Sequence, residues 1–532
     1  MKKFILGAAA ATLAVTLAGC SGSSDPAPAT AGTGNGAKYA ATATPYQPKQ
    51  SLATYSQAPA GFSPVFTQAV VRHGSRGQSS FDASVWNMIE QARVDGALTP
   101  LGFNLRADIW KMMKANALLD YGVAGITTPG YGNLSQTGIT EQQQMAARLL
   151  QRLPSYFTQV AATSGTASPR QIVYASSGVN RTIDSAGFFT QSLIANNSAL
   201  KPLIIPSASL TAYPANKPVA QAAGINRFLL YFHKLAAKTD LVSATTDPYY
   251  TTYTNSLLYQ AYLTNTNMVS KVNALLTSPA AKANASAVLL RLFTQDFVNK
   301  IDNGTYTFAN LATFTFTSDD GKYMATVSST STTPTIQSLT DAANELYGFY
   351  NIAPEMTTEL NNLDFTQYIP DAQAGYLAYL DDVQSYYQKG PGITEDSPIT
   401  YKMAQILEDD FFNEVDAIAK GNMSHGAVLR FTHAEEIIPF ATLLGLQIAA
   451  TSTANANNYT YDNNAWRGSS FGSGANVQWD VYSDGNGNLL VRMLYNEQET
   501  DFKPACDSAR YATGSHYYTY SGLKTCYNHV AN

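Results

Sequence analysis

Residues 72–76 form an Arg-His-Gly-Ser-Arg segment, which places two arginines around one histidine. A guanidinium group offers a planar fork of N–H donors that matches the oxygens of a phosphate group. A neutral imidazole nitrogen between two such groups can attack phosphorus, and Gly74 lets the backbone approach a ligand closely. The segment therefore predicts phosphoryl-transfer chemistry, with His73 as nucleophile and with Arg72 and Arg76 as phosphate-binding groups.

A second segment, Thr432-His433-Ala434-Glu435, stands between an apolar run at 426–431 and a helical pattern at 436–446. The apolar run predicts a buried strand. The first segment also follows an apolar run, at 65–71. Both segments are therefore expected at strand ends, where their side chains can share one site.

These two segments resemble the signature motifs of the histidine phosphatase superfamily, in the branch that holds acid phosphatases and phytases. His433-Ala434-Glu435 is similar to the His-Ala-Glu variant of the multiple inositol polyphosphate phosphatases. Residues 176–189, which include Arg181, resemble the segment that carries the family's third phosphate-binding arginine. The stretches 379–382, 386–390 and 490–497 are similar as well, so the resemblance runs from about residue 64 to residue 506.

Two departures from the family pattern concern substrate preference. Gly77-Gln78-Ser79 follows the first motif, where many phytases have an aromatic residue, Pro and Thr. Residues 206–340 match no motif of the family. The resemblance therefore implies the chemistry better than the specificity.

The resemblance implies that Arg72, Arg76, Arg181 and His433 surround the phosphoryl group while His73 attacks it. Water then resolves a phosphohistidine intermediate. Glu435 is the expected proton donor and Glu436 its alternative, because successive side chains point apart. A helix N-terminus and nearby arginines lower a carboxyl pKa, whereas a general acid needs it raised, so burial against substrate or an acidic working pH must offset them.

By the same resemblance the expected substrates are inositol polyphosphates, chiefly phytate. A broad-specificity histidine acid phosphatase is the first alternative, and a surface lipoprotein that binds phosphorylated ligands without turnover is the second. A highly anionic substrate calls for further cations at the rim, for which Lys389, Arg106 and Arg227 are candidates.

Other motifs carry weaker signals. Residues 468–472 match the Gly-x-Ser-x-Gly elbow of serine hydrolases, but no apolar strand precedes them. The Asp484–Asn488 run lacks the acidic residue that closes a calcium loop, so it predicts a hairpin turn between strands at 477–482 and 489–495.

With six histidines and no His-Glu-x-x-His pattern, we expect no metal and no cofactor. The remaining histidines are expected to be structural or solvent-facing: His233, His425, His516 and His529.

Composition sets the class of protein. The chain has 532 residues, 45% of them hydrophobic, a formal net charge of −5 and no long Lys/Arg run, which argues against nucleic acid as a partner. The pattern predicts an α/β protein with a mixed-sheet core of the histidine phosphatase type and an inserted, mainly helical cap. We expect core segments at 51–204 and 401–532 and the cap at 205–400.

The amino terminus predicts export. Residues 1–20 comprise a basic start, an apolar alanine-rich stretch and Leu-Ala-Gly-Cys, which resembles a bacterial lipobox with Cys20 as the lipidated residue. An ordinary cleaved signal peptide and a membrane helix are the alternatives. Ser21 favours the outer membrane, by resemblance to other lipoproteins.

Residues 21–50 predict a flexible tether. The only cysteines besides Cys20 are Cys506 and Cys526, and they predict a disulfide.

Overall fold

The structure is a computed structural model that describes residues 38–210 and 219–530. The predicted signal peptide, Cys20 and most of the predicted tether lie outside these residues. Within them, no helix is both long and apolar enough to cross a bilayer.

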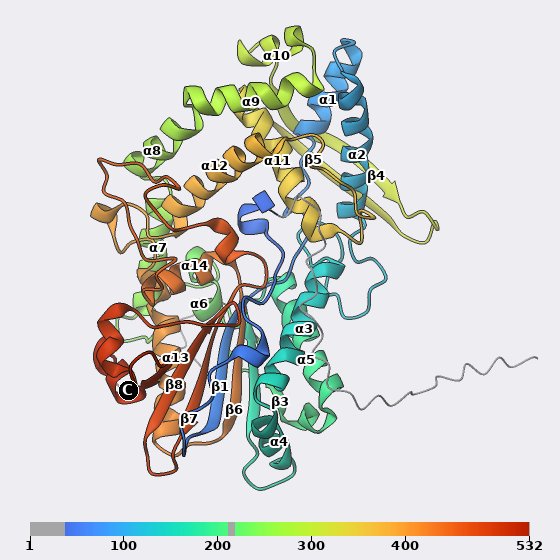
Figure 1. Ribbon diagram of the computed structural model, residues 1–532. Helices are drawn as coiled ribbons and strands as arrows, with labels where there is room; N and C mark the ends of the chain where they lie inside the picture. Colours follow the sequence, from blue (N-terminus) through green and yellow to red (C-terminus); the bar gives the residue numbers. More distant parts are fainter. Residues whose placement is uncertain (1–37, 211–218, 531–532) are drawn as a thin grey trace, which may run out of the picture. The chain divides into compact units, whose positions relative to one another are not determined.

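In the described chain, eight strands form one mixed sheet in the order β10-β8-β7-β1-β6-β2-β3, with β9 paired to β8 (Figure 1). The central strands β1, β6, β2 and β3 are parallel, and β7, β8 and β10 continue the sheet antiparallel. The strands are Ser63–Arg72 (β1), Gln171–Ser176 (β2), Ile204–Pro206 (β3), His425–Thr432 (β6), Asn476–Ser483 (β7), Leu489–Tyr495 (β8), Gln498–Glu499 (β9) and Tyr517–Thr519 (β10). The mixed α/β fold is confirmed.

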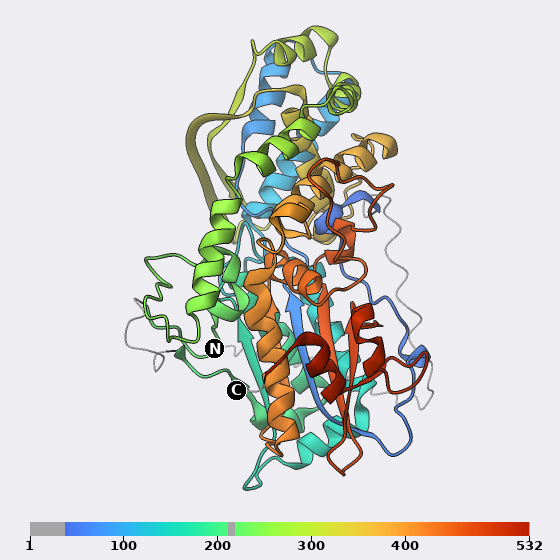
Figure 2. The same ribbon diagram turned by 90° about the vertical axis from the view of Figure 1, so that its left-hand side faces the viewer.

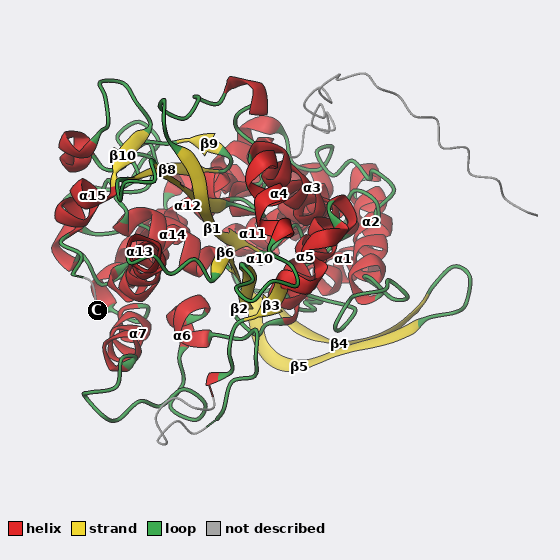
Figure 3. Ribbon diagram, turned by 90° about the horizontal axis from the view of Figure 1, so that it is seen from below, coloured by secondary structure: helices red, strands yellow, loops and turns green. Residues whose placement is uncertain are grey.

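Helices cover both faces of the sheet (Figure 3). Side chains alternate along β1, so Ala69 and Val71 pack in one hydrophobic cluster while Phe66 and Val70 pack in another. The first cluster is completed by α3 (Gln136–Arg152), α4 (Pro154–Ala162) and α5 (Asn180–Asn196), and the second by α13 (Gln405–Ala419) and α14 (Ala434–Leu443). Such double burial explains why the central strands read as continuous apolar runs.

The cap has its own hydrophobic cluster beyond the carboxyl ends of the parallel strands (Figures 1 and 2). Its hairpin of β4 (Phe308–Thr317) and β5 (Met324–Ile336) was not predicted, although its polar and apolar side chains alternate. Trp110 packs on Phe314 and Phe316 and joins this hairpin to the helices. The cap helices are α1 (Ser84–Val94), α2 (Pro100–Ala117), α9 (Pro279–Leu292), α10 (Gln295–Asp302), α11 (Leu339–Ile352) and α12 (Asp371–Lys389).

The boundary between core and cap differs from the predicted one in two places. Helices α1 and α2, expected in the core, belong to the cap cluster. Conversely, α6 (Arg227–Leu230), α7 (Tyr250–Tyr262) and α8 (Thr266–Leu276), expected in the cap, contribute to the core cluster around α13. Periodicity predicts that a segment is a helix, but not which neighbour its apolar face will meet.

Residues 38–56, which we call the N-terminal strap, are packed against the body, although residues up to 50 were expected to be tether. Ala40, Ala41 and Tyr46 are buried. The strap runs from cap to core, with hydrogen bonds between Tyr39 and Tyr347, Thr42 and Arg72, Tyr46 and Glu141, and Tyr55 and Glu497. Its Pro and small residues suggested a linker, but its tyrosines supply the contacts that fix it.

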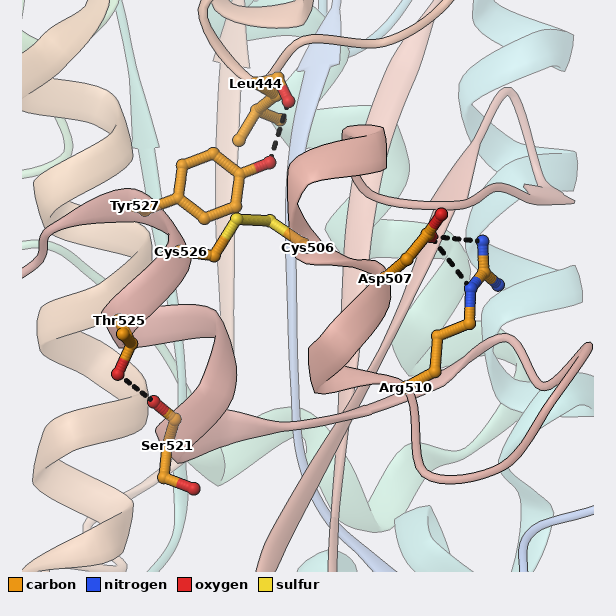
Figure 4. The surroundings of a disulfide bond; sticks show 8 residues. All are labelled: Leu444, Cys506, Asp507, Arg510, Ser521, Thr525, Cys526 and Tyr527. Atoms are coloured by element: carbon orange, nitrogen blue, oxygen red, sulfur yellow. Dashed lines mark hydrogen bonds and ion pairs between the residues drawn. A yellow bond between two sulfur atoms is a disulfide. The ribbon is translucent and has the colours of Figure 1, made fainter.

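The carboxyl-terminal helix α15 (Tyr520–Tyr527) is fastened by the predicted disulfide between Cys506 and Cys526 (Figure 4). The Tyr527 hydroxyl also donates a hydrogen bond of 2.7 Å to the Leu444 carbonyl, just after α14. The disulfide therefore ties this segment to the core.

Candidate active site

Three parallel strands bring the candidate residues together. Arg72, the last residue of β1, is paired in register with Thr432, the last residue of β6. The residues that follow, His73 and His433, are therefore neighbours, with ring centroids 5.5 Å apart. From β2 on the other side of β6, residues 177–181 turn into α5 and bring Arg181 to the same edge. The structure thus brings the predicted residues together at the carboxyl ends of these strands.

His73 is buried and held in one tautomer. Its Nδ1 lies 2.9 Å from the Gly74 carbonyl oxygen, which can only accept, so Nδ1 carries the proton and Nε2 has a free lone pair. Burial, followed by the charges of Arg181 and Arg72, holds the pKa of His73 well below its usual range. A neutral imidazole with Nε2 unprotonated is the form that a nucleophile requires.

Three arginines surround His73 and are incompletely bonded. Arg72 donates from Nη1 to the carbonyls of Thr42 (2.6 Å) and Phe471 (2.7 Å), and Arg76 donates to Gly77 (2.6 Å). The Nε atoms of both, and that of Arg181, are buried without a hydrogen-bond partner among the described residues. Burial, followed by the charge of Arg76, lowers the pKa of Arg181 to about 10. Buried donors left free beside mutually repelling charges indicate an anion site.

His433 is bonded at both ring nitrogens. Arg181 can only donate, so Nδ1 of His433 accepts its bond of 2.9 Å, and Nε2 donates to the Ser177 hydroxyl at 2.8 Å. Burial and the charge of Arg181 hold the pKa of His433 well below its usual range. His433 thus orients Arg181, and the direct phosphate contact that the resemblance implies stays a prediction. Ser177 was not singled out from the sequence.

The two neighbouring carboxylates have different environments. Glu435 accepts a bond of 2.8 Å from Lys389, and 32% of its side chain is exposed. Glu436 is buried and bonded to His233 at 2.5 Å and to Thr432 at 3.1 Å. Only Glu435 is open to a substrate, which favours it over Glu436 as the proton donor.

Two buried carboxylates behind the first motif were missed. Glu355, from the cap, accepts from the Arg76 backbone N–H at 2.9 Å and from the Ser473 hydroxyl at 2.5 Å. Glu141, from α3, accepts from the N–H and the hydroxyl of Ser75, both at 2.7 Å, and burial raises its pKa to about 7. No motif marks them, because their partners are mainly backbone groups.

Glycines allow the motif to lie directly on α3. A Cβ atom on Gly74 would come within 2.5 Å of the Gly138 carbonyl, and one on Gly138 would overlap Ser75 backbone atoms. The first turn of α3 is capped by Ser135, which accepts from the Gly138 N–H at 3.2 Å. The motif is therefore supported by backbone contact as well as by carboxylates.

A cavity of about 270 Å³ lies beside Arg181, the one candidate site residue in its lining. The other proposed rim cations are committed elsewhere: Arg106 pairs with Glu90 within the cap, and Arg227 pairs with Asp240 at 2.8 Å. Lys389 alone of the three contacts a candidate catalytic residue. The cavity is lined by Ser79, Thr128, Tyr131, Gly132, Asn133, Val179, Asn180 and Arg181.

The other motifs have structural roles. Residues Gly468–Phe471 form a 3-10 helix whose last carbonyl accepts from Arg72, so the Gly-x-Ser-x-Gly match supports the anion site. The Asp484 carboxylate bonds the N–H groups of Asn486 and Asn488 across the predicted hairpin turn. In the part of the chain that the structure describes, no group of three or more His, Cys, Asp or Glu side chains is placed to hold a metal ion.

Fold and site together define a phosphoryl-transfer enzyme of the histidine type. The family described as the histidine phosphatase superfamily, branch 2, matches residues 65–496. The chain therefore belongs to branch 2 of the histidine phosphatase superfamily and is a histidine-type phosphatase.

Solved structures give a finer comparison. The multiple inositol polyphosphate phosphatase of Bifidobacterium longum, in complex with inositol hexasulfate, is 30% identical with a TM-score of 0.76, over 92% of this chain and 97% of that chain. Its apo form is 31% identical with a TM-score of 0.75 over the same shares. The phytase of D. castellii, 11% identical with a TM-score of 0.51 over 92% of this chain and 84% of that chain, shares the fold. No curated protein sequence matches the chain.

Proposed function

We propose that this phosphatase hydrolyses inositol polyphosphates such as phytate, without a metal, through a phosphohistidine at His73. The observation that carries the proposal is the neutral, single-tautomer His73 among three arginines whose Nε donors are free. Such a site binds a phosphoryl group by charge and presents a lone pair to phosphorus.

In this mechanism the phosphate oxygens occupy the free donors of Arg72, Arg76 and Arg181. His73 Nε2 attacks in line, and Glu435 gives a proton to the leaving oxygen. Glu435 then takes a proton from the water that cleaves the phosphohistidine. His433 contributes by holding Arg181 in place through the 2.9 Å bond.

Similarity supports the substrate class. The B. longum enzyme, similar over 97% of its length, is named a multiple inositol polyphosphate phosphatase and binds inositol hexasulfate, a ring with six anionic esters. The His433-Ala434-Glu435 motif is of the same type, and the cavity beside Arg181 gives room for a ring and further phosphates.

The test is release of inorganic phosphate from phytate by the purified chain from Ser21 on, at mildly acidic pH with a metal chelator present. We expect chelator-resistant release, a fall of at least about 10³-fold in His73→Ala, and trapping of acid-labile phosphate on the wild type. His425→Ala is the matched control, because His425 begins β6 and bonds Glu414 at 2.9 Å away from the site.

Other results would identify the alternatives. Turnover of p-nitrophenyl phosphate without turnover of phytate would show a broad-specificity acid phosphatase. Binding of phosphorylated ligands with no turnover of either substrate would show a binding protein. Loss of activity with the chelator, restored by a metal, would exclude the metal-independent mechanism.

For its location, we propose an exported lipoprotein anchored through Cys20, in the outer membrane and facing the periplasm or the cell surface. The Cys506–Cys526 disulfide supports an oxidising compartment. Incorporation of labelled palmitate into the wild type but not into Cys20→Ala is the expected result. A soluble, unlabelled mature chain would favour an ordinary cleaved signal peptide.

A further inference from the structure

One ion pair joins α12 to the proposed proton donor. Lys389 is the last residue of α12, whose C-terminal part packs in the core cluster, and Glu435 lies in the first turn of α14, a core helix. Lys389 Nζ and Glu435 Oε1 are 2.8 Å apart, and their side chains remain 16% and 32% exposed. The pair thus stands at the edge of the site, where a substrate can reach it.

Within the described chain, no further hydrogen bond or ion pair holds either member of the pair in place. Among the described residues, neither side chain has a second hydrogen-bond or ion-pair partner, so two ammonium N–H groups and one carboxylate oxygen stay free. By contrast, Arg492 bonds Asp480, Glu499 and Tyr517 at once. A single, partly exposed pair without further partners can exchange its partner when another anion binds nearby.

The pair determines the state of Glu435. Burial raises the Glu435 pKa, but Lys389, followed by His233, holds it well below its usual range. A carboxylate held in this way has no proton to give at mildly acidic pH, although the proposed reaction needs one. The other ionisable groups that face it are His433, Arg181, Arg72, Glu436, Tyr231 and Tyr259.

We propose that Lys389 makes proton donation conditional on a substrate that carries more than one phosphate group. In the empty site Lys389 holds Glu435. When a polyphosphate binds, Lys389 transfers to a phosphate other than the one being cleaved, and Glu435 is released beside the leaving oxygen. The inference rests on the proposed function and adds a specificity-determining residue to it.

The exchange leads to a balanced reaction. Freed from Lys389 and covered by substrate, Glu435 takes up one proton from the acidic bulk solvent. His73 Nε2 forms a bond to phosphorus as the ester P–O bond breaks, the electron pair of that bond goes to the leaving oxygen, and Glu435 transfers its proton there. A simple monoester fills only the arginine site and offers Lys389 no second anion.

The test compares Lys389→Met with wild type on phytate and on p-nitrophenyl phosphate from pH 4 to pH 7. We expect kcat/KM for phytate to fall about tenfold, while kcat/KM for the simple ester is kept or increased. For the simple ester, the high-pH limb of the pH–rate profile should move to higher pH by about one unit. The reason is that removing the Lys389 charge raises the Glu435 pKa. Lys111→Met is the control, because Lys111 is an exposed cap lysine that also pairs with one carboxylate, that of Asp108.

A double variant tests whether Lys389 acts through Glu435 or only stabilises the fold. In the Glu435→Gln background, Lys389→Met should no longer move the limb, because the group that it acts on is gone. Equal losses on both substrates with an unchanged profile, or no change on either, would overturn the proposal. If the wild type cleaves the simple ester but not phytate, the proposed function is wrong. The pH profile on the simple ester then still tests whether Lys389 controls the Glu435 pKa, since Lys389→Met should shift the high-pH limb upward.

Discussion

The two halves of the active site are held by different kinds of contact. The phosphate half, residues 72–76, is bonded to backbone carbonyls and to the buried carboxylates of Glu355 and Glu141. The proton half, residues 433–436, is bonded to charged or titratable side chains, chiefly Lys389, His233 and Arg181. The groups around His73 are therefore preorganised, whereas Glu435, the proposed proton donor, is held by a single ion pair among the described residues.

Among variants that keep every candidate catalytic residue, the largest expected effect comes from disturbing the backbone of the phosphate half. In Gly138→Ala the new methyl group would overlap Ser75 backbone atoms and push the motif out of position. We expect kcat to fall about 100-fold on phytate and on p-nitrophenyl phosphate alike, with an unchanged pH profile. Steady-state kinetics with circular dichroism measures this. Gly187→Ala, in α5 with no atom within 4 Å of the new methyl, should keep wild-type kcat.

Glu355→Gln changes one buried carboxylate that bonds the phosphate half, and so tests that half without altering its backbone. The amide keeps a single accepting oxygen where the carboxylate serves both Arg76 N–H and Ser473. We expect a loss of about tenfold in kcat/KM, again equal for both substrates. Glu359→Gln is the control, since Glu359 bonds Gln136 at 2.7 Å and not the motif. A loss confined to phytate would instead place Glu355 among substrate contacts.

In the proton half, His233→Gln should change the pH profile more than the maximal rate. Besides Lys389, His233 holds down the pKa of Glu435, so its removal lets that pKa rise. Glu435 then stays protonated to higher pH, and the high-pH limb for p-nitrophenyl phosphate should move upward, by less than in Lys389→Met. We expect kcat to change only about twofold, because Gln can still donate to Glu436. A downward shift would contradict the assigned acid.

Outside both halves, loss of the disulfide should affect stability alone. Cys506 and Cys526 are 20 residues apart, and opening that loop in Cys506→Ser should lower the free energy of unfolding by about 3 kcal/mol. Denaturant unfolding monitored by fluorescence measures it, and Cys526→Ser should give the same loss. Activity of the folded variant should equal that of the wild type. A drop in kcat would show that the C-terminal segment reaches the site.

The proximity of the candidate residues could be predicted from the sequence because most of them lie in two short segments. Arg72, His73 and Arg76 follow one buried strand and His433 and Glu435 follow another, and parallel neighbours end at the same edge. The bounds of the predicted hairpin strands were also close: strands expected at 477–482 and 489–495 are found at Asn476–Ser483 and Leu489–Tyr495.

The parts that were missed depend on long-range contacts. Glu355 meets Arg76 across 279 positions, and nothing near Glu355 marks it as a partner of the motif. Helices α1 and α2 were expected in the core but pack in the cap cluster, because periodicity does not predict which neighbour an apolar face will meet. The β4–β5 hairpin was missed although its alternating Thr and Phe side chains carried the signal.

The N-terminal strap contributes a contact to the active site from outside the family match. The Thr42 carbonyl that orients Arg72 stands 30 positions upstream of it and outside the family match, which starts at residue 65. A fragment trimmed to 65–496 would keep every signature residue but lose one of the two carbonyls on that guanidinium. The orientation of Arg72 therefore depends on a segment that carries no signature residue, and the shortest chain that keeps both carbonyl contacts of Arg72 includes the strap.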